Sequence, residues 1–65
     1  MRVGDRVRLE DGQTGRIKAL RRELDRIVMG RAQRGEWIAV IELDGMPPRL
    51  TSRYTRVLKR EAAYG

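Results

Sequence analysis

The sequence of 65 residues contains no cysteine and no histidine. Without cysteine, a disulfide, a thiolate nucleophile and a cysteine-based metal site are all excluded. Histidine is the commonest general base and transition-metal ligand, so only carboxylates and arginines remain as candidates for chemistry. The carboxylates are scattered among arginines at turns and strand ends, a pattern that favours ion pairing over a catalytic pair. We therefore expect no enzyme, no cofactor and no bound metal.

Long apolar runs are also absent. No stretch approaches the roughly 20 residues that span a bilayer, and the N-terminus lacks the apolar core of a signal peptide. We expect a soluble cytoplasmic protein with no membrane partner, folded as a single domain over residues 1–65 with a frayed tail at 60–65. A domain of this size buries only roughly 60% of its unfolded surface, so its stability is marginal.

Aromatic residues are few, with no phenylalanine, one tryptophan and two tyrosines. Basic residues are abundant, because 15 Lys and Arg stand against 9 Asp and Glu for a net charge of +6. Nearly all of them are arginine, which binds phosphates and carboxylates in a bidentate manner. A small basic domain indicates a nucleic-acid partner. The alternative is that arginine enrichment reflects a GC-rich or thermophilic source.

The run from Trp37 to Asp44 is the most apolar in the chain and is rich in β-branched residues. It predicts the central strand of a small sheet. Alternation places its odd-numbered residues on one face and its even-numbered residues on the other. The odd-numbered set consists of Trp37, Ala39, Ile41 and Leu43. At the head of this strand, Trp37 is expected in the core, with a stacking platform as the alternative.

Shorter strands are expected on either side of it. Residues 1–9 predict a half-buried strand with Val3, Val7 and Leu9 inward, followed by a polar hairpin loop over 10–15. Residues 16–20 resume the alternation, with Ile17 and Ala19 inward. After Pro47-Pro48, residues 49–54 predict a short strand, and residues 55–59 a last strand carrying Val57 and Leu58. The expected core comprises Val7, Leu9, Ile17, Ile41, Leu43 and Val57.

Residues 20–35 admit two interpretations. Leu20, Leu24, Ile27 and Val28 recur at helical spacing, but no Ser, Thr, Asp or Asn precedes them as an N-cap. Residues 26–29 are rich in β-branched side chains, and residues 33–35 suit a return into the central strand. We favour extended strands around a turn near Asp25, with a short helix within residues 19–31 as the alternative.

Five short strands with closely spaced turns predict an all-β fold, a single small barrel. The segments Gly4–Leu9 and Gly15–Leu20, with Gly12 between them, resemble the opening of SH3-like barrels, in particular KOW-type domains. Those domains occur in ribosomal proteins and transcription elongation factors, so the resemblance implies a nucleoprotein setting. The loop here differs from a KOW loop in its length and in carrying Glu10 and Asp11 where lysines often stand.

Two basic clusters are candidate nucleic-acid contacts. The first lies on the outer face of the predicted strand pair and consists of Arg6, Arg8, Arg16 and Lys18. It forms a phosphate track, unless neighbouring carboxylates such as Glu10 neutralise it. The second lies near the C-terminus and consists of Arg53, Tyr54, Arg56 and Lys59. In it Tyr54 either stacks on a base or plugs the barrel end with its hydroxyl bonded to backbone.

Two functions from different classes follow. The first is a non-enzymatic β-barrel that binds nucleic acid, or sits in a nucleoprotein assembly, through arginine–phosphate contacts. The second is a protein-interaction module that binds an acidic protein surface. The scarcity of aromatics favours duplex or structured RNA over single strands. The sequence selects neither DNA nor RNA, and it sets no oligomeric state.

Overall fold

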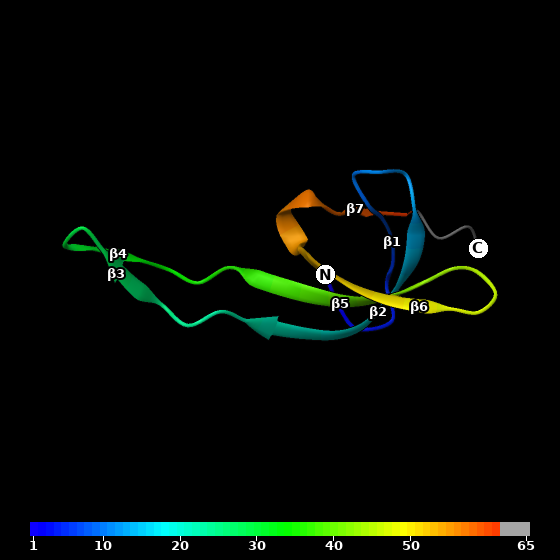
Figure 1. Cartoon of the computed structure of the whole chain (residues 1–65), viewed down its shortest axis with the longest axis horizontal. Coiled ribbons are helices and arrows are strands. Elements are labelled where there is room, and N and C mark those ends of the chain that lie inside the picture. The colour runs from blue at the N-terminus through cyan, green and yellow to red at the C-terminus, as the bar shows by residue number, and fades with distance from the viewer. Residues whose placement is uncertain (62–65) are drawn as a thin grey trace.

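A computed structural model describes residues 1–61 of the chain (Figure 1). Strands are their main regular structure, so the predicted all-β class is confirmed and the alternative of a helix within residues 19–31 is wrong. The only helix among them is one 3-10 turn, η1, too short to cross a membrane. The elements are β1 (Arg6–Arg8), β2 (Thr14–Arg22), β3 (Arg26–Val28), β4 (Arg31–Gln33), β5 (Trp37–Leu43), β6 (Arg49–Tyr54), η1 (Thr55–Val57) and β7 (Lys59–Arg60).

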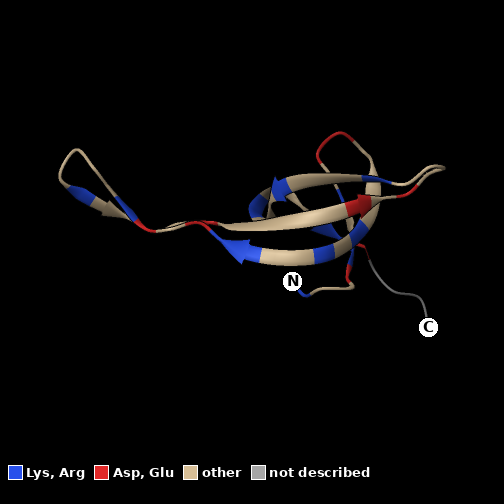
Figure 2. Cartoon of the chain, turned by 60° about the horizontal axis from the view of Figure 1, so that its bottom comes forward, with Lys and Arg blue, Asp and Glu red and all other residues tan. Residues whose placement is uncertain are grey.

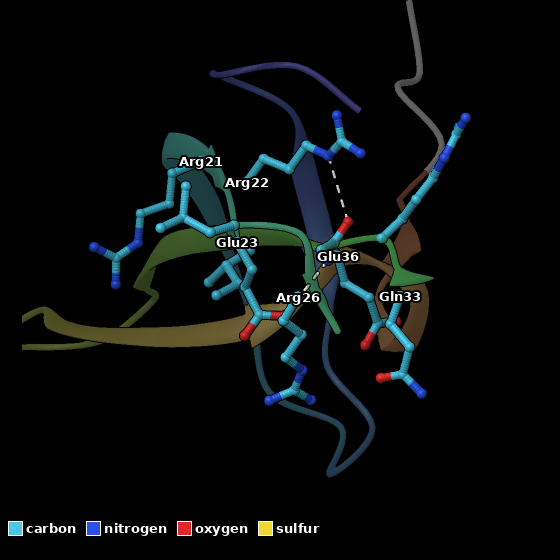
Figure 3. Close-up of a pocket in the computed structure, with 10 residues that line it drawn as sticks. Arg21, Arg22, Glu23, Arg26, Gln33 and Glu36 are labelled. Atoms are coloured by element: carbon cyan, nitrogen blue, oxygen red, sulfur yellow. Dashed lines mark hydrogen bonds between the residues drawn. The ribbon is translucent and has the colours of Figure 1, made fainter. Parts of the chain in front are cut away.

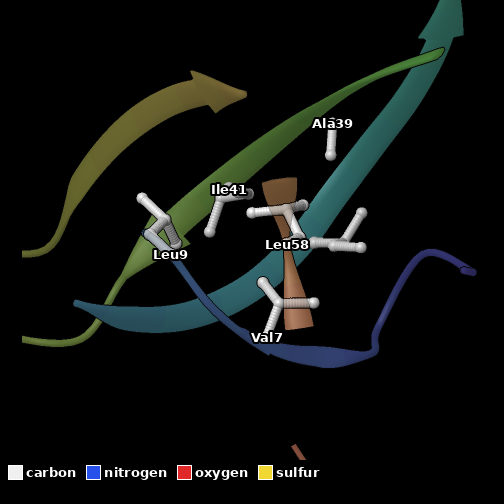
Figure 4. Packing of buried hydrophobic residues seen from close by; sticks show 6 residues of the cluster. Val7, Leu9, Ala39, Ile41 and Leu58 are labelled. Atoms are coloured by element: carbon white, nitrogen blue, oxygen red, sulfur yellow. The ribbon is translucent and has the colours of Figure 1, made fainter. Parts of the chain in front are cut away.

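Five strands form one curled antiparallel sheet in the order β6-β5-β2-β1-β7. Strand β5 pairs with β2 on one side and with β6 on the other, which confirms its predicted central position. The two outer strands of this order, β6 and β7, are joined through η1. The sheet therefore wraps around a single small core (Figures 1 and 4).

The core lies on the concave side of the sheet. Its buried members are Val7, Leu9, Ile17, Ala39, Ile41 and Leu58. Four of the six residues expected in the core are among them, while Leu43 and Val57 are partly buried and pack against the cluster. Ala39 takes its place through the predicted alternation of β5, and Leu58 enters from the segment after η1.

A β-bulge at Lys18 changes the facing of the second half of β2. Ile17 lies opposite Ile41, but Ala19 lies opposite Val40, so two steps along β2 match one step along β5. An extra residue in one strand reverses the side-chain alternation beyond it. Ala19 is therefore exposed, contrary to its predicted inward facing, and Leu20 turns towards the core instead.

Four further expectations about the strands are wrong at the ends of the elements. Val3 is 61% exposed, because β1 begins only at Arg6. Trp37 is 51% exposed, because it lies at the end of β5 beyond the core. Residues 55–57 form η1 rather than the start of a last strand. Arg60 belongs to β7, although the tail was expected to begin there; residues 62–65 of that tail lie outside the described residues.

Residues 23–36 form an arm that projects from the sheet as a two-stranded ribbon (Figure 1). Strands β3 and β4 pair only with each other, and the chain reverses at Met29-Gly30 rather than near Asp25. The arm gives the molecule its long axis, with overall dimensions of 46 × 27 × 20 Å. Its apolar side chains do not pack in the core: Leu24 is 89% exposed and Ile27 is 77% exposed.

Replacing Ile41 by alanine should lower the free energy of unfolding by about 2–5 kcal/mol, because Ile41 is completely buried at the centre of the cluster. That loss is a large share of the stability of a small domain. Thermal unfolding followed by circular dichroism measures it. The matched control is Leu50→Ala on the neighbouring β6, where the side chain is exposed and the expected change is within about 0.5 kcal/mol. Equal melting of the two variants would contradict this description of the core.

Candidate nucleic-acid interface

The sheet-face cluster predicted from the sequence is assembled, but it is partly neutralised. Arg6 and Arg16 are direct cross-strand partners on the outer face, and Lys18 is exposed at the bulge. Both terminal nitrogens of Arg6 donate to the carboxylate of Asp44. Arg8 lies 3.8 Å from Glu61. Within this cluster of four, Arg16 and Lys18 have no ion pair among the described residues.

Asp44 is the carboxylate that most alters this face. Its oxygens accept hydrogen bonds from Arg6 and, at 2.6 Å, from the Thr14 hydroxyl. These bonds stabilise the charged carboxylate, so the pKa of Asp44 lies below its usual value. For the same reason the pKa of Arg6 is raised. Arg6 is thus committed to a partner 38 positions away in the sequence.

The second predicted cluster is neutralised further. Arg53 binds Glu10 at 2.8 Å, and Arg56 binds Glu36 at 2.7 Å. The guanidinium of Arg56 also lies 5.2 Å from the centre of the Tyr54 ring. Lys59 lies on β7 and has no ion pair within residues 1–61.

Tyr54 has a different role from either of those expected. Its hydroxyl donates to the Glu23 carboxylate at 3.2 Å rather than to backbone, and this bond is the main reason that the pKa of Tyr54 is raised. Its ring is covered in part by Arg56. Tyr54 therefore connects β6 to the base of the arm.

Of the basic residues in 1–61, six arginines form ion pairs. The cations without such a pair in this range are Arg2, Arg16, Lys18, Arg21, Arg26, Arg31, Arg34, Arg49 and Lys59. Four of these lie on the arm or directly before it, a region where the sequence analysis placed no functional residue. Figure 2 shows acidic segments where the arm leaves the sheet and basic segments further out.

The neck, where the arm joins the sheet, consists of residues 22–25 and 34–37. Its three carboxylates are all engaged within the protein. Glu23 accepts from Tyr54 and from the Glu36 amide, and Glu36 binds Arg56. Asp25 accepts from the Gly35 amide at 2.8 Å and from Arg22 at 3.3 Å. Residues 26–34 contain three arginines and no carboxylate.

Gly35 allows the two chains of the neck to approach closely. A Cβ at this position would stand 1.9 Å from the carbonyl oxygen of Glu23, a distance that no side chain tolerates. The close approach lets the Glu23 amide donate to the Glu36 carbonyl at 3.0 Å and brings Gly35 to Asp25. The neck is therefore a tightly bonded support that holds the arm on the sheet.

A concave surface of about 710 Å³ lies along one side of the neck (Figure 3). Its polar lining includes Arg21, Arg26, Gln33 and Arg34, together with the engaged Glu23 and Glu36. Figure 3 shows the Arg21 and Arg26 side chains extending outward, whereas Arg22 bends back to donate to the Gly35 carbonyl. Three arginines without an ion pair among the described residues thus line one hollow at the base of the arm.

The two faces of the arm differ in chemistry. Arg26 lies opposite Gln33, and Val28 lies opposite Arg31, so these four side chains share one face. Ile27 lies opposite Ala32 on the other face. The ribbon is therefore polar and basic on one side and apolar on the other. The signal available in the sequence was the stretch from Arg26 to Arg34, which carries arginines and no acidic residue.

Comparison of the chain with protein families, with curated proteins and with solved structures finds no match. Within residues 1–61, no three carboxylates gather in an arrangement that could hold a metal ion.

Asp44→Asn should lower the melting temperature at neutral pH, because it removes a charged acceptor from both Arg6 and Thr14. Since the pKa of Asp44 is depressed in the folded state, the stabilisation is present above the unfolded value of about 3.9 and is lost as pH falls through the folded value. Wild type and variant should therefore converge in melting temperature as the pH falls through the lowered pKa of folded Asp44. A difference that persisted undiminished in acid would show that the carboxylate charge is not its cause.

Proposed function

We propose that this protein is a non-enzymatic nucleic-acid-binding domain whose arm is its principal contact surface. The observation that carries the proposal is the distribution of the unpaired cations. The neck carboxylates are engaged within the protein, while Arg21, Arg26, Arg31 and Arg34 have no ion pair within the described residues. Arginine binds phosphate groups in a bidentate manner, so the phosphate backbone of a nucleic acid is a suitable ligand for these side chains.

The arrangement suits a backbone-gripping mechanism. Arg21, Arg26 and Arg34 line one concave surface and reach it from both sides of the arm, so a phosphodiester chain lying along it would meet several guanidinium groups. Each contact releases condensed counterions from the nucleic acid, which supplies most of the affinity. The resemblance of the first third of the chain to KOW-type domains agrees with this function. On the sheet, Arg16 and Lys18 are additional contacts.

A second function is favoured by a specific observation, the exposure of large apolar side chains on the arm. Leu24 and Ile27 are mostly exposed, and Met29 is 97% exposed. Apolar side chains beside unpaired arginines would also suit an acidic protein surface with an apolar centre. Under this alternative the chain is an adaptor or assembly component.

Titration of the full chain with a duplex at several salt concentrations tests the first function. The four arginines concerned are Arg21, Arg26, Arg31 and Arg34. If they neutralise phosphates, the logarithm of the association constant should fall with the logarithm of salt concentration at a slope of about −3 to −4. Fluorescence anisotropy of a labelled duplex gives the slope. Trp37, the only tryptophan, lies at the neck and is half exposed, so its emission should change on binding.

Two double charge reversals distinguish binding by the arm arginines from binding through net charge alone. Arg26→Glu with Arg34→Glu should weaken binding strongly and reduce the salt slope by about 2. Arg49→Glu with Lys59→Glu makes the same change in net charge at unpaired positions off the arm and should have a much smaller effect. Equal losses of duplex affinity in the two double variants would mean that the protein binds polyanions through its net charge alone. Absence of duplex binding at low salt would overturn the proposal in favour of the acidic protein surface.

A further inference from the structure

We infer that the arm enters the major groove of duplex DNA, with its polar face towards the base edges. The inference rests on the proposed function and specifies its ligand. Arg26 and Gln33 are direct cross-strand partners on that face, and Arg31 follows on the same face. Arginine forms bidentate hydrogen bonds with the O6 and N7 of guanine, and glutamine with the N6 and N7 of adenine. The side chains best suited to reading purines thus stand together on one side of a projecting ribbon.

The dimensions of the arm fit this groove. The major groove of B-form DNA is about 12 Å wide and 8.5 Å deep and admits a two-stranded β-ribbon. Met29 at the tip lies seven positions beyond Arg22, the last position of the sheet, a reach of roughly 23 Å at the rise of a β-strand. The tip can therefore reach the groove floor while the sheet remains outside the duplex. The major groove of A-form RNA is too narrow for this entry.

The base of the arm supplies the phosphate contacts that such a docking requires. Arg21 and Arg34 line the concave surface at the neck, so they would meet phosphates bordering the groove where the ribbon leaves it. Glu23 and Glu36 line the same surface, but Tyr54 and Arg56 engage them. The carboxylates nearest to the phosphates are thus held by the protein, and the arginines remain available.

The turn at the tip carries a residue that its backbone does not favour. Met29 has φ of 50° and Gly30 has φ of 77°, so both central residues adopt the left-handed conformation of a tight two-residue hairpin. Asn, Asp or Gly is favoured at the first of these positions, whereas methionine adopts the left-handed conformation at a cost in free energy. No packing offsets this cost, because Met29 is almost completely exposed. The exposed Met29 side chain can therefore be covered only by a ligand. The thymine methyl group on the groove floor offers it an apolar contact.

Charge disfavours a second copy of the chain as the occupant of the arm. Two tips placed together would bring Arg26, Arg31 and Arg34 of each ribbon against the same residues of the other. No carboxylate lies between residues 26 and 34 to relieve the repulsion. A polyanionic duplex has the complementary charge.

The test compares a mixed-sequence DNA duplex with the same duplex in which every guanine is replaced by 7-deazaguanine. This replacement removes the N7 acceptor from the major groove and leaves the phosphates unchanged. Wild-type protein should bind the modified duplex about 5-fold more weakly, because each bidentate arginine–guanine contact is reduced to a single hydrogen bond with O6. The Arg26→Ala, Arg31→Ala double variant should bind both duplexes alike. A ligand that binds the minor groove should not compete with the protein for the duplex.

The outcomes separate the inference from the proposed function. Equal binding of wild-type protein to both duplexes, with the salt slope retained, would overturn groove entry while nucleic-acid binding stood. Binding to neither duplex would overturn both and leave the acidic protein surface.

A second variant tests the tip without weakening the fold. Met29→Asn suits the left-handed turn, so the melting temperature should be equal to or above that of wild type, and yet affinity for unmodified duplex should fall. Unchanged affinity in this stably folded variant would show that the tip does not reach the bases and would overturn the inference.

Discussion

The antiparallel pairing of β2 with β5 is the constraint on which the rest of the structure depends. At one end of this ladder, Ile17 and Ile41 lie opposite each other and form the centre of the core. The ladder continues past the core to Arg22 and Trp37, where the chain leaves the sheet as the arm. Because one strand pair builds the core and supports the arm, the position of the arm is fixed by the best-packed part of the molecule.

The hydrogen bonds of the neck decide where the positive charge is available. Glu23, Asp25 and Glu36 bind partners on β6, on η1 and within the neck itself. These bonds hold the arm to the sheet and also prevent the same carboxylates from neutralising the arginines beyond them. Sheet-face arginines differ, since Arg6 and Arg8 are each paired with a carboxylate distant in sequence. Support for the arm and its unneutralised charge therefore have the same physical origin.

Apolar alternation was sufficient to predict β5, its central position and most of the core, because burial of one face imposes that pattern. The bulge at Lys18 has no local signature, so the facing of Ala19 could not be predicted. At the tip, Met29-Gly30 lacks the Asn or Asp that marks a hairpin turn, and the turn was therefore placed near Asp25. The candidate clusters followed from sequence proximity, which does not reveal that Arg6 meets Asp44 or that Arg56 meets Glu36. The arm arginines were missed for the converse reason: their availability depends on where the acidic residues are bound.

The central claim is that the arm, and not the sheet face, is the contact surface. Backbone amide shifts followed by NMR during titration of the labelled full chain with a DNA duplex test it most directly. We predict that the largest shift changes occur in residues 21–36, with smaller changes at Arg16 and Lys18. Large changes confined to β1 and the first half of β2, with the amides of β3 and β4 unmoved, would contradict the account.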